Sequence, residues 1–178
     1  MDMIRKAVFI APLIAILVLA SGLDAIGKEY SLGSENDDWW TTYPDQSTAS
    51  GGQVAHPGWV LNALKSKPVL IYVHRNCGYC APQTEAVGNI TDEFGGRIEF
   101  YEISAESGDT MSNEALKAYD PNGGAISYVP LTVVVTLALD SEGRVVPVWH
   151  SSDDVTGEDW IRSYIENALI LHGESSAG

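Results

Sequence analysis

The residues of this chain best suited to chemistry are its two cysteines, Cys77 and Cys80, which are separated by two residues in a CGYC motif. The motif lies between an apolar run that ends near Val73 and a helix-like segment that begins close to Pro82. A thiol at a helix N-terminus faces unpaired backbone N–H groups and the positive end of the helix dipole, and both favour the thiolate. Two intervening residues let the second sulfur reach the first and resolve a mixed disulfide. We therefore expect Cys77 to be the attacking thiol and Cys80 the resolving thiol.

Three other uses of a closely spaced cysteine pair are a structural cross-link, a metal site and two inert buried thiols. A cross-link over so short a loop removes little chain entropy. A metal site needs further ligands, and only His74 lies close in the sequence. Inert thiols have no reason to stand at the start of a helix. The pattern favours redox chemistry, and the alternative is a metal-binding or delivery module that uses Cys77, Cys80 and His74.

The composition restricts the class of protein that carries this motif. Of the 178 residues, 45% are hydrophobic and 19% are charged, which excludes wholesale disorder and a polytopic membrane protein. The formal net charge of −14 repels phosphate backbones, so we expect no nucleic-acid partner. Two cysteines are too few for a disulfide framework or for a four-thiolate zinc site.

Residues 1–26 have the pattern of a targeting segment. Arg5 and Lys6 precede an unbroken apolar run over 7–20, and small residues follow it. This pattern predicts a signal peptide that is cleaved after Ala20 or, as a second choice, after Gly22. If the segment is retained, it is an N-terminal membrane anchor. In either case we expect the remainder to be extracytoplasmic, secreted or membrane-anchored, in a compartment where disulfides persist.

Strand and helix patterns alternate through most of the remaining chain. They predict strands at 69–73, 97–103, 131–139 and 145–149, and helices at 59–64, 82–94, 113–119 and after a cap at Thr156. The almost wholly apolar run 131–139 is typical of a central strand that is covered on both faces. We therefore expect an α/β domain over 54–172, with a mixed central β-sheet flanked by helices on both faces, and a short C-terminal tail over 173–178.

Residues 27–53 have the Ser-, Thr-, Gly-, Asp- and Pro-rich composition of a linker. The exception is the aromatic group Trp39, Trp40 and Tyr43, which is costly to leave in water. We expect these side chains to pack onto the domain, and the alternative is a partner-binding strip.

Two separate motifs resemble the thioredoxin superfamily. Residues 67–73 followed by the CGYC motif are similar to that family's strand, active-site loop and helix, and residues 128–134 are similar to the segment that carries its cis-proline. The resemblance implies a thioredoxin fold over 54–172 and a cis peptide bond between Val129 and Pro130. The substrate-binding residues that it implies, beside Cys77, are Val129, Pro130, Gly78 and Tyr79.

The resemblance also implies an activity, that of a thiol–disulfide oxidoreductase of the protein-disulfide reductase, oxidase or isomerase type. It implies no bound cofactor besides the redox-active disulfide Cys77–Cys80. The implied partners are cysteine-containing exported proteins and a membrane or extracytoplasmic thiol redox partner. Proteins with this fold also handle copper, so a copper-binding module using the same two cysteines and His74 stays the alternative.

The sequence departs from the thioredoxin pattern in three places. Ile71 stands where thioredoxin has a buried Asp that helps proton transfer, and Asn76 stands where a Trp usually precedes the first cysteine. The Gly-Tyr dipeptide between the cysteines is similar to that of periplasmic disulfide isomerases. These departures disfavour a cytosolic-type role and lean toward an oxidase or isomerase, while the direction of electron flow stays open.

Two residues near the motif are candidate modulators of the thiols. A protonated His74 would raise the thiolate fraction of Cys77, and otherwise His74 is a solvated residue at a strand end. Tyr72 either places a hydroxyl near Cys80 or packs in the core. The remaining titratable residues are expected on the surface, namely His56, His150, His172, Glu106 and Asp109.

Overall fold

The computed structural model describes residues 28, 30–106, 108–124 and 127–177. The targeting segment expected at 1–26 lies outside these residues, so its interpretation stays a prediction. Within the described ranges, no helix has the length and apolar character needed to cross a membrane.

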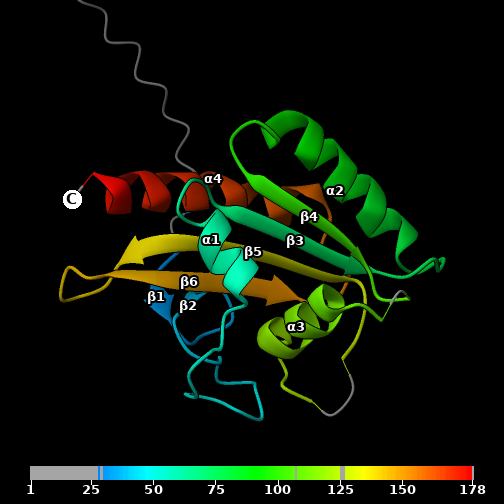
Figure 1. The fold of residues 1–178 in the computed structure, drawn as a ribbon, viewed down its shortest axis with the longest axis horizontal. Helices are drawn as coiled ribbons and strands as arrows, with labels where there is room; N and C mark the ends of the chain where they lie inside the picture. Colours follow the sequence, from blue (N-terminus) through cyan, green and yellow to red (C-terminus); the bar gives the residue numbers. More distant parts are fainter. Residues whose placement is uncertain (1–27, 29, 107, 125–126, 178) are drawn as a thin grey trace, which may run out of the picture.

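Among the described residues, six strands form one mixed sheet at the centre of the protein (Figure 1). The strands are β1 (Leu32–Gly33), β2 (Trp39–Trp40), β3 (Val69–His74), β4 (Glu99–Ser104), β5 (Leu131–Leu139) and β6 (Val145–Ser152), in the order β1-β2-β6-β5-β3-β4. β3 is parallel to β4 and antiparallel to β5, and β5 is antiparallel to β6. The long strand β5 is buried over most of its length, as its continuous apolar run predicts.

In the part of the chain that the structure describes, four helices cover the two faces of this sheet (Figure 1). They are α1 (Gly58–Ala63), α2 (Ala81–Phe94), α3 (Thr110–Tyr119) and α4 (Glu158–Ser176). Side chains alternate along β3, so that Leu70 and Tyr72 join the core under α2 and α4, whereas Ile71 and Val73 join the core under α1 and α3. A β3-α2-β4 unit with parallel strands, followed by an antiparallel β5-β6 hairpin and α4, is the thioredoxin fold. The expected fold class is confirmed.

The segment expected to be a linker belongs to the folded unit instead. Its strands β1 and β2 extend the sheet beyond β6, where Trp40 lies beside Trp149. Trp39 is 0% exposed, and its indole N–H donates to Asn167 Oδ1 at 2.7 Å. Trp40 is 1% exposed and packs edge-on against Trp149. The aromatic residues pack onto the domain as expected. Burying such large apolar rings is strongly favourable, and their burial therefore holds residues 30–53 against the domain.

Two helix boundaries differ from the sequence-based expectation because of local hydrogen bonds. α3 begins three residues early because Asp109 caps it, with its carboxylate accepting from the backbone N–H of Ser112 at 2.7 Å. Asp109 is therefore a capping residue rather than only a solvated charge. α4 begins after Gly157, a residue with φ of +77°, and not after a capping Thr156. The hydroxyl of Thr156 is engaged elsewhere, as described below.

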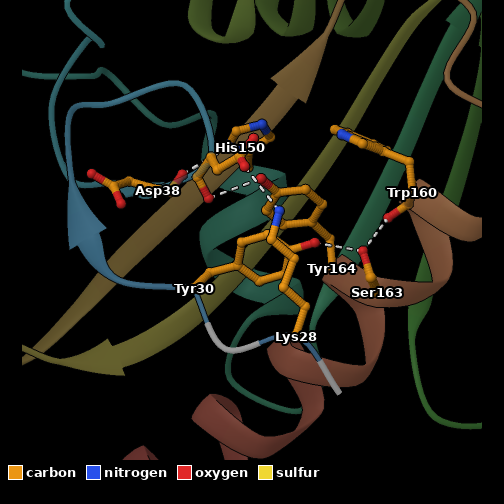
Figure 2. Close-up of polar contacts among 8 residues, drawn as sticks. Lys28, Tyr30, Asp38, His150, Trp160, Ser163 and Tyr164 are labelled. Carbon is orange, nitrogen blue, oxygen red and sulfur yellow. Dashed lines mark hydrogen bonds and ion pairs between the residues drawn. The ribbon is translucent and has the colours of Figure 1, made fainter. Parts of the chain in front are cut away.

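Two of the histidines expected on the surface are buried. His150 is 4% exposed, and His172, whose Nε2 lies 2.8 Å from the carbonyl oxygen of Leu64, is 9% exposed. The ring of His150 stacks on Tyr164 with centroids 4.2 Å apart, and its Nδ1 lies 2.7 Å from the carbonyl oxygen of Asp38 (Figure 2). On the other side of the Tyr164 ring, Tyr30 from the N-terminal segment stacks at 4.1 Å. The N-terminal segment thus supplies much of the cover over His150.

Burial of His150 gives the fold a defined pH dependence. Desolvation lowers the pKa of His150 to about 4, against about 6.5 in the unfolded chain. The unfolded state therefore binds the extra proton first, and the stabilisation is fully present above pH 6.5 and is lost as the pH falls toward 4. We expect the free energy of unfolding to drop by about 3 kcal/mol through this residue across that window.

Urea unfolding followed by tryptophan fluorescence between about pH 7.5 and 4.5 measures this dependence. His150→Gln keeps a donor for the Asp38 carbonyl but has no titrating ring, so its stability curve should be flatter over the same range. An unchanged slope in the variant would show that other groups carry the pH dependence.

Candidate functional site: a thiol pair at the start of α2

The CGYC motif occupies the turn between the end of β3 and the first residue of α2. Cys77 is exposed, whereas Cys80 is the N-cap of α2 and only 1% exposed. The turn is closed by hydrogen bonds from the Cys80 N–H to the Cys77 carbonyl at 3.1 Å and from the Thr84 N–H to the Cys80 carbonyl at 3.0 Å. Pro82 in the first turn has its φ fixed at a helical value and so suits the helix start. The two Sγ atoms are 2.8 Å apart.

The environment separates the acidities of the two thiols. The pKa of the Cys77 thiol is lowered, chiefly by its hydrogen bond with the Cys80 sulfur and then by backbone N–H groups of Cys80 and Tyr79, with a smaller contribution from the positive charge of Arg75. The pKa of the Cys80 thiol is raised, chiefly by its burial. Deprotonation therefore falls first on the exposed Cys77 sulfur, which is the sulfur that a bound substrate can reach.

This asymmetry predicts how the reduced protein reacts with iodoacetamide. We expect Cys77 to be alkylated at least about tenfold faster than Cys80 at pH 7. As the pH is varied, the alkylation rate of Cys77 should rise at lower pH than that of Cys80. Mass spectrometry of peptides after short exposures measures both rates. Equal labelling of the two residues would contradict the prediction.

Tyr72 packs in the core and also places its hydroxyl near Cys80, so both roles considered for it from the sequence are observed. Its side chain is 0% exposed. The hydroxyl donates to the Cys80 carbonyl oxygen at 3.1 Å and lies 2.8 Å from the Thr84 hydroxyl. Tyr72 thus anchors the backbone of the first turn of α2, and with it the position of the Cys80 sulfur.

His74 is half-buried rather than fully solvated. Its ring stacks on Tyr72 with centroids 4.9 Å apart and planes 10° apart, and its Nε2 lies 3.2 Å from Glu102 Oε1 on β4. Together with Cys77 and Cys80 it lines an open cavity of about 500 Å³ at the start of α2. The structure therefore brings His74 into one site with both thiols.

The residues expected to bind substrate lie around this end of the sheet. The Val129–Pro130 peptide bond is cis, as the resemblance implied. Leu131, the first residue of β5, pairs with Val73 in the antiparallel β5–β3 ladder. Pro130, the residue before it, therefore lies near the C-terminal end of β3, where the CGYC turn begins. Gly78 and Tyr79 are exposed, and the Tyr79 hydroxyl donates to the carboxylate of Asp154 in the loop between β6 and α4.

Gln83 is a residue of this site that the sequence reasoning missed. It lies one turn after Cys80 and is 0% exposed. Its amide nitrogen donates to the hydroxyls of Thr132 at 2.8 Å and Thr156 at 3.0 Å, and its oxygen accepts from the Thr156 N–H at 2.9 Å. The first turn of α2 is thereby joined to β5 and to the start of α4. The available signal was a polar residue four positions before Val87 on an otherwise apolar helix face.

Two further positions complete the surroundings of the thiols. Ile71, at the place of the thioredoxin acid, is 0% exposed within the apolar core under α1 and α3. Glu106 is not only a solvated charge, because its carboxylate accepts from the backbone N–H of Asn76 at 3.3 Å. Across the residues that the structure describes, no three His, Cys, Asp or Glu side chains are grouped so that they could hold a metal ion, and this includes Cys77, Cys80 and His74.

Comparisons with known proteins find similar solved structures. No protein-family model matches this chain, and no curated protein does. Among solved structures, a thioredoxin from Thermus thermophilus is 15% identical, with 66% of this chain and 85% of that chain covered and a TM-score of 0.44. A thiol:disulfide interchange protein of the thioredoxin family from Chlorobium tepidum TLS is 16% identical, with 61% and 83% covered and a TM-score of 0.41. Chloroplastic thioredoxin z is 16% identical, with 68% and 91% covered and a TM-score of 0.40.

The fold assignment rests on the strand order and pairing of this chain itself. By these, the chain is a thioredoxin-fold protein that carries a closely spaced thiol pair at the N-terminus of α2.

Proposed function

We propose that this protein is an exported thiol–disulfide oxidoreductase that exchanges disulfides with cysteine-containing proteins. The observation that carries the proposal is an exposed thiol of lowered pKa lying 2.8 Å from a buried thiol of raised pKa at a helix start. The exposed Cys77 sulfur can attack a substrate disulfide or, when oxidised, be attacked by a substrate thiol. The buried Cys80 sulfur is close enough to complete the exchange.

In the reductive direction, the Cys77 thiolate attacks a substrate disulfide and forms a mixed disulfide. Cys80 then attacks the Cys77 sulfur, the substrate leaves as a thiol, and the pair becomes the Cys77–Cys80 disulfide. In the oxidative direction the same steps run backward. The exposed Gly78 and Tyr79, and Val129 and Pro130 just before the start of β5, form the surface on which an extended substrate segment lies.

The proposal includes the setting in which the reaction takes place. The targeting pattern of residues 1–26 supports an extracytoplasmic protein, free or tethered to the membrane by this segment. The substrates are then exported proteins with cysteines. No bound cofactor is required, because electrons enter or leave through a membrane or extracytoplasmic thiol partner.

The test is the reduction potential of the Cys77–Cys80 pair, measured in the full chain by equilibration in glutathione buffers and trapping by alkylation. A value above about −200 mV assigns the protein to oxidases and isomerases, and a value below about −250 mV to reductases that draw electrons from a partner. Cys77→Ser is the control that must lose the transition. A wild-type pair that never exchanges with glutathione would overturn the proposal.

A further inference from the structure

The buried thiol must lose its proton before it can complete the exchange, and the residues around it decide where that proton goes. Cys80 is 1% exposed, and burial raises its pKa. The position that carries a buried acid in thioredoxin is Ile71 here, within an apolar core. The Tyr72 hydroxyl is already hydrogen-bonded to the Cys80 carbonyl and to Thr84.

The titratable and charged groups that face the thiol cavity come from three elements. β3 and the turn after it contribute His74 and Arg75, and α2 contributes Glu85 beside the two cysteines. β4 contributes Glu102 behind His74, and the loop after β4 contributes Glu106, whose carboxylate accepts from the backbone N–H of Asn76 at 3.3 Å. Arg75 stays protonated and cannot accept a proton. Glu85 is an exposed residue of α2 that lines the same cavity as the thiols.

His74 has a ring nitrogen that can accept a proton, and its neighbours hold the ring in place. Leu70 and Tyr72, at alternate positions of β3, lie on the face of the strand that packs against α2. His74 is the next residue on this face and lies nearest to the first turn of α2. Stacking on Tyr72 fixes the plane of the ring, and Glu102 lies 3.2 Å from Nε2. A carboxylate beside Nε2 favours the tautomer that carries its proton there and leaves the lone pair on Nδ1.

We propose that His74, positioned by Glu102 and Tyr72, is the base that takes the proton of Cys80 when Cys80 resolves the mixed disulfide. This inference rests on the proposed oxidoreductase function. The Cys80 S–H proton passes to His74 Nδ1, directly or through one water in the cavity. The Cys80 sulfur bonds to the Cys77 sulfur, the bond from Cys77 to the substrate sulfur breaks, and the substrate leaves as a thiolate that takes up a proton. The cysteine pair is oxidised by two electrons and the substrate disulfide is reduced.

Stopped-flow mixing of the reduced full chain with an aromatic disulfide, 5,5′-dithiobis(2-nitrobenzoate), separates the two steps. Attack by Cys77 releases the first coloured thiolate, and resolution by Cys80 releases the second. In His74→Asn we expect the second phase to slow by about 10²-fold at pH 7, the magnitude of general-base catalysis. The first phase should change by less than about threefold. The pH profile of the second-phase rate should also differ from that of the wild type, because the group that takes the Cys80 proton is gone.

Three companion measurements keep the result specific. Glu102→Gln, at a half-exposed position of the edge strand β4, should slow the second phase by about tenfold while leaving His74 in place. Added imidazole should restore part of the second phase in His74→Ala. Glu85→Gln is the matched control in the same cavity and should leave both phases unchanged.

The outcomes distinguish this inference from the function on which it rests. A second phase that keeps its rate and pH profile in His74→Asn, or that slows only in Glu85→Gln, would overturn the role of His74. Equal slowing of both phases, with no rescue by imidazole, would assign His74 a structural role and also overturn the proposal. If the wild-type chain releases no coloured thiolate at all, the oxidoreductase function itself fails.

Discussion

Cys80→Ser is expected to turn this protein into a covalent trap. Cys77 keeps its exposed position and can still attack a disulfide, but a hydroxyl at position 80 cannot break the mixed disulfide that forms. Turnover should fall by on the order of 10³-fold or more, and a protein–substrate adduct that dithiothreitol reverses should accumulate.

Non-reducing electrophoresis and intact-mass measurement after incubation with glutathione disulfide, or with a disulfide-bonded protein, detect this adduct. Cys77→Ser should lose turnover to the same extent and form no adduct, because the remaining thiol is buried. Ser141→Ala, in the exposed hairpin turn between β5 and β6, is a control that should keep wild-type exchange. A stable adduct in Cys77→Ser, with none in Cys80→Ser, would reverse the roles of the two sulfurs.

The second large effect is on stability and lies in the N-terminal segment. Trp39→Ala removes a fully buried ring that packs edge-on against Tyr164 at 5.3 Å, and it leaves the buried Asn167 without its indole partner. We expect a loss of about 3–5 kcal/mol in the free energy of unfolding, the range for large-to-small changes at buried aromatic residues. Urea unfolding at pH 7 measures it.

Matched variants separate the causes of that loss. Trp39→Phe keeps most of the apolar area and loses the hydrogen bond, so its cost should be about 1–3 kcal/mol. Leu32→Ala, at a residue 37% exposed in β1, should change stability by less than about 1 kcal/mol. The folded fraction of each variant should keep normal thiol exchange, because β6 and β5 lie between β2 and the strand that leads to Cys77.

The same packing changes what removal of residues 27–53 should do. If the segment were a linker, deletion would leave the domain intact. The structure predicts instead that deletion exposes the edge of β6 and the ring of Trp149, so that the remaining chain unfolds or aggregates. A deletion variant as stable as the full chain would contradict this.

Local sequence was sufficient for the parts of the site that depend on short spacing. The thiol pair between a strand and a helix and the buried strand β5 were expected from runs of fewer than ten residues. The cis Val129–Pro130 bond was expected from the resemblance to the thioredoxin superfamily. Helix starts were less secure, because one capping side chain decides them. Asp109 moved the start of α3, and the engagement of Thr156 by Gln83 removed the expected cap of α4.

The sequence by itself determined which residues can carry thiol chemistry and which strand and helix hold them, because those features follow from residue type and spacing along a few turns of chain. Only the tertiary structure decided that the N-terminal segment completes the sheet, that His150 is buried, and that Glu102 stands beside His74. Each of these depends on strand register or side-chain packing between residues 28 to 112 positions apart. Contacts at such separations leave no periodic pattern in the sequence, because they are selected by the total burial of the whole fold rather than by any local preference.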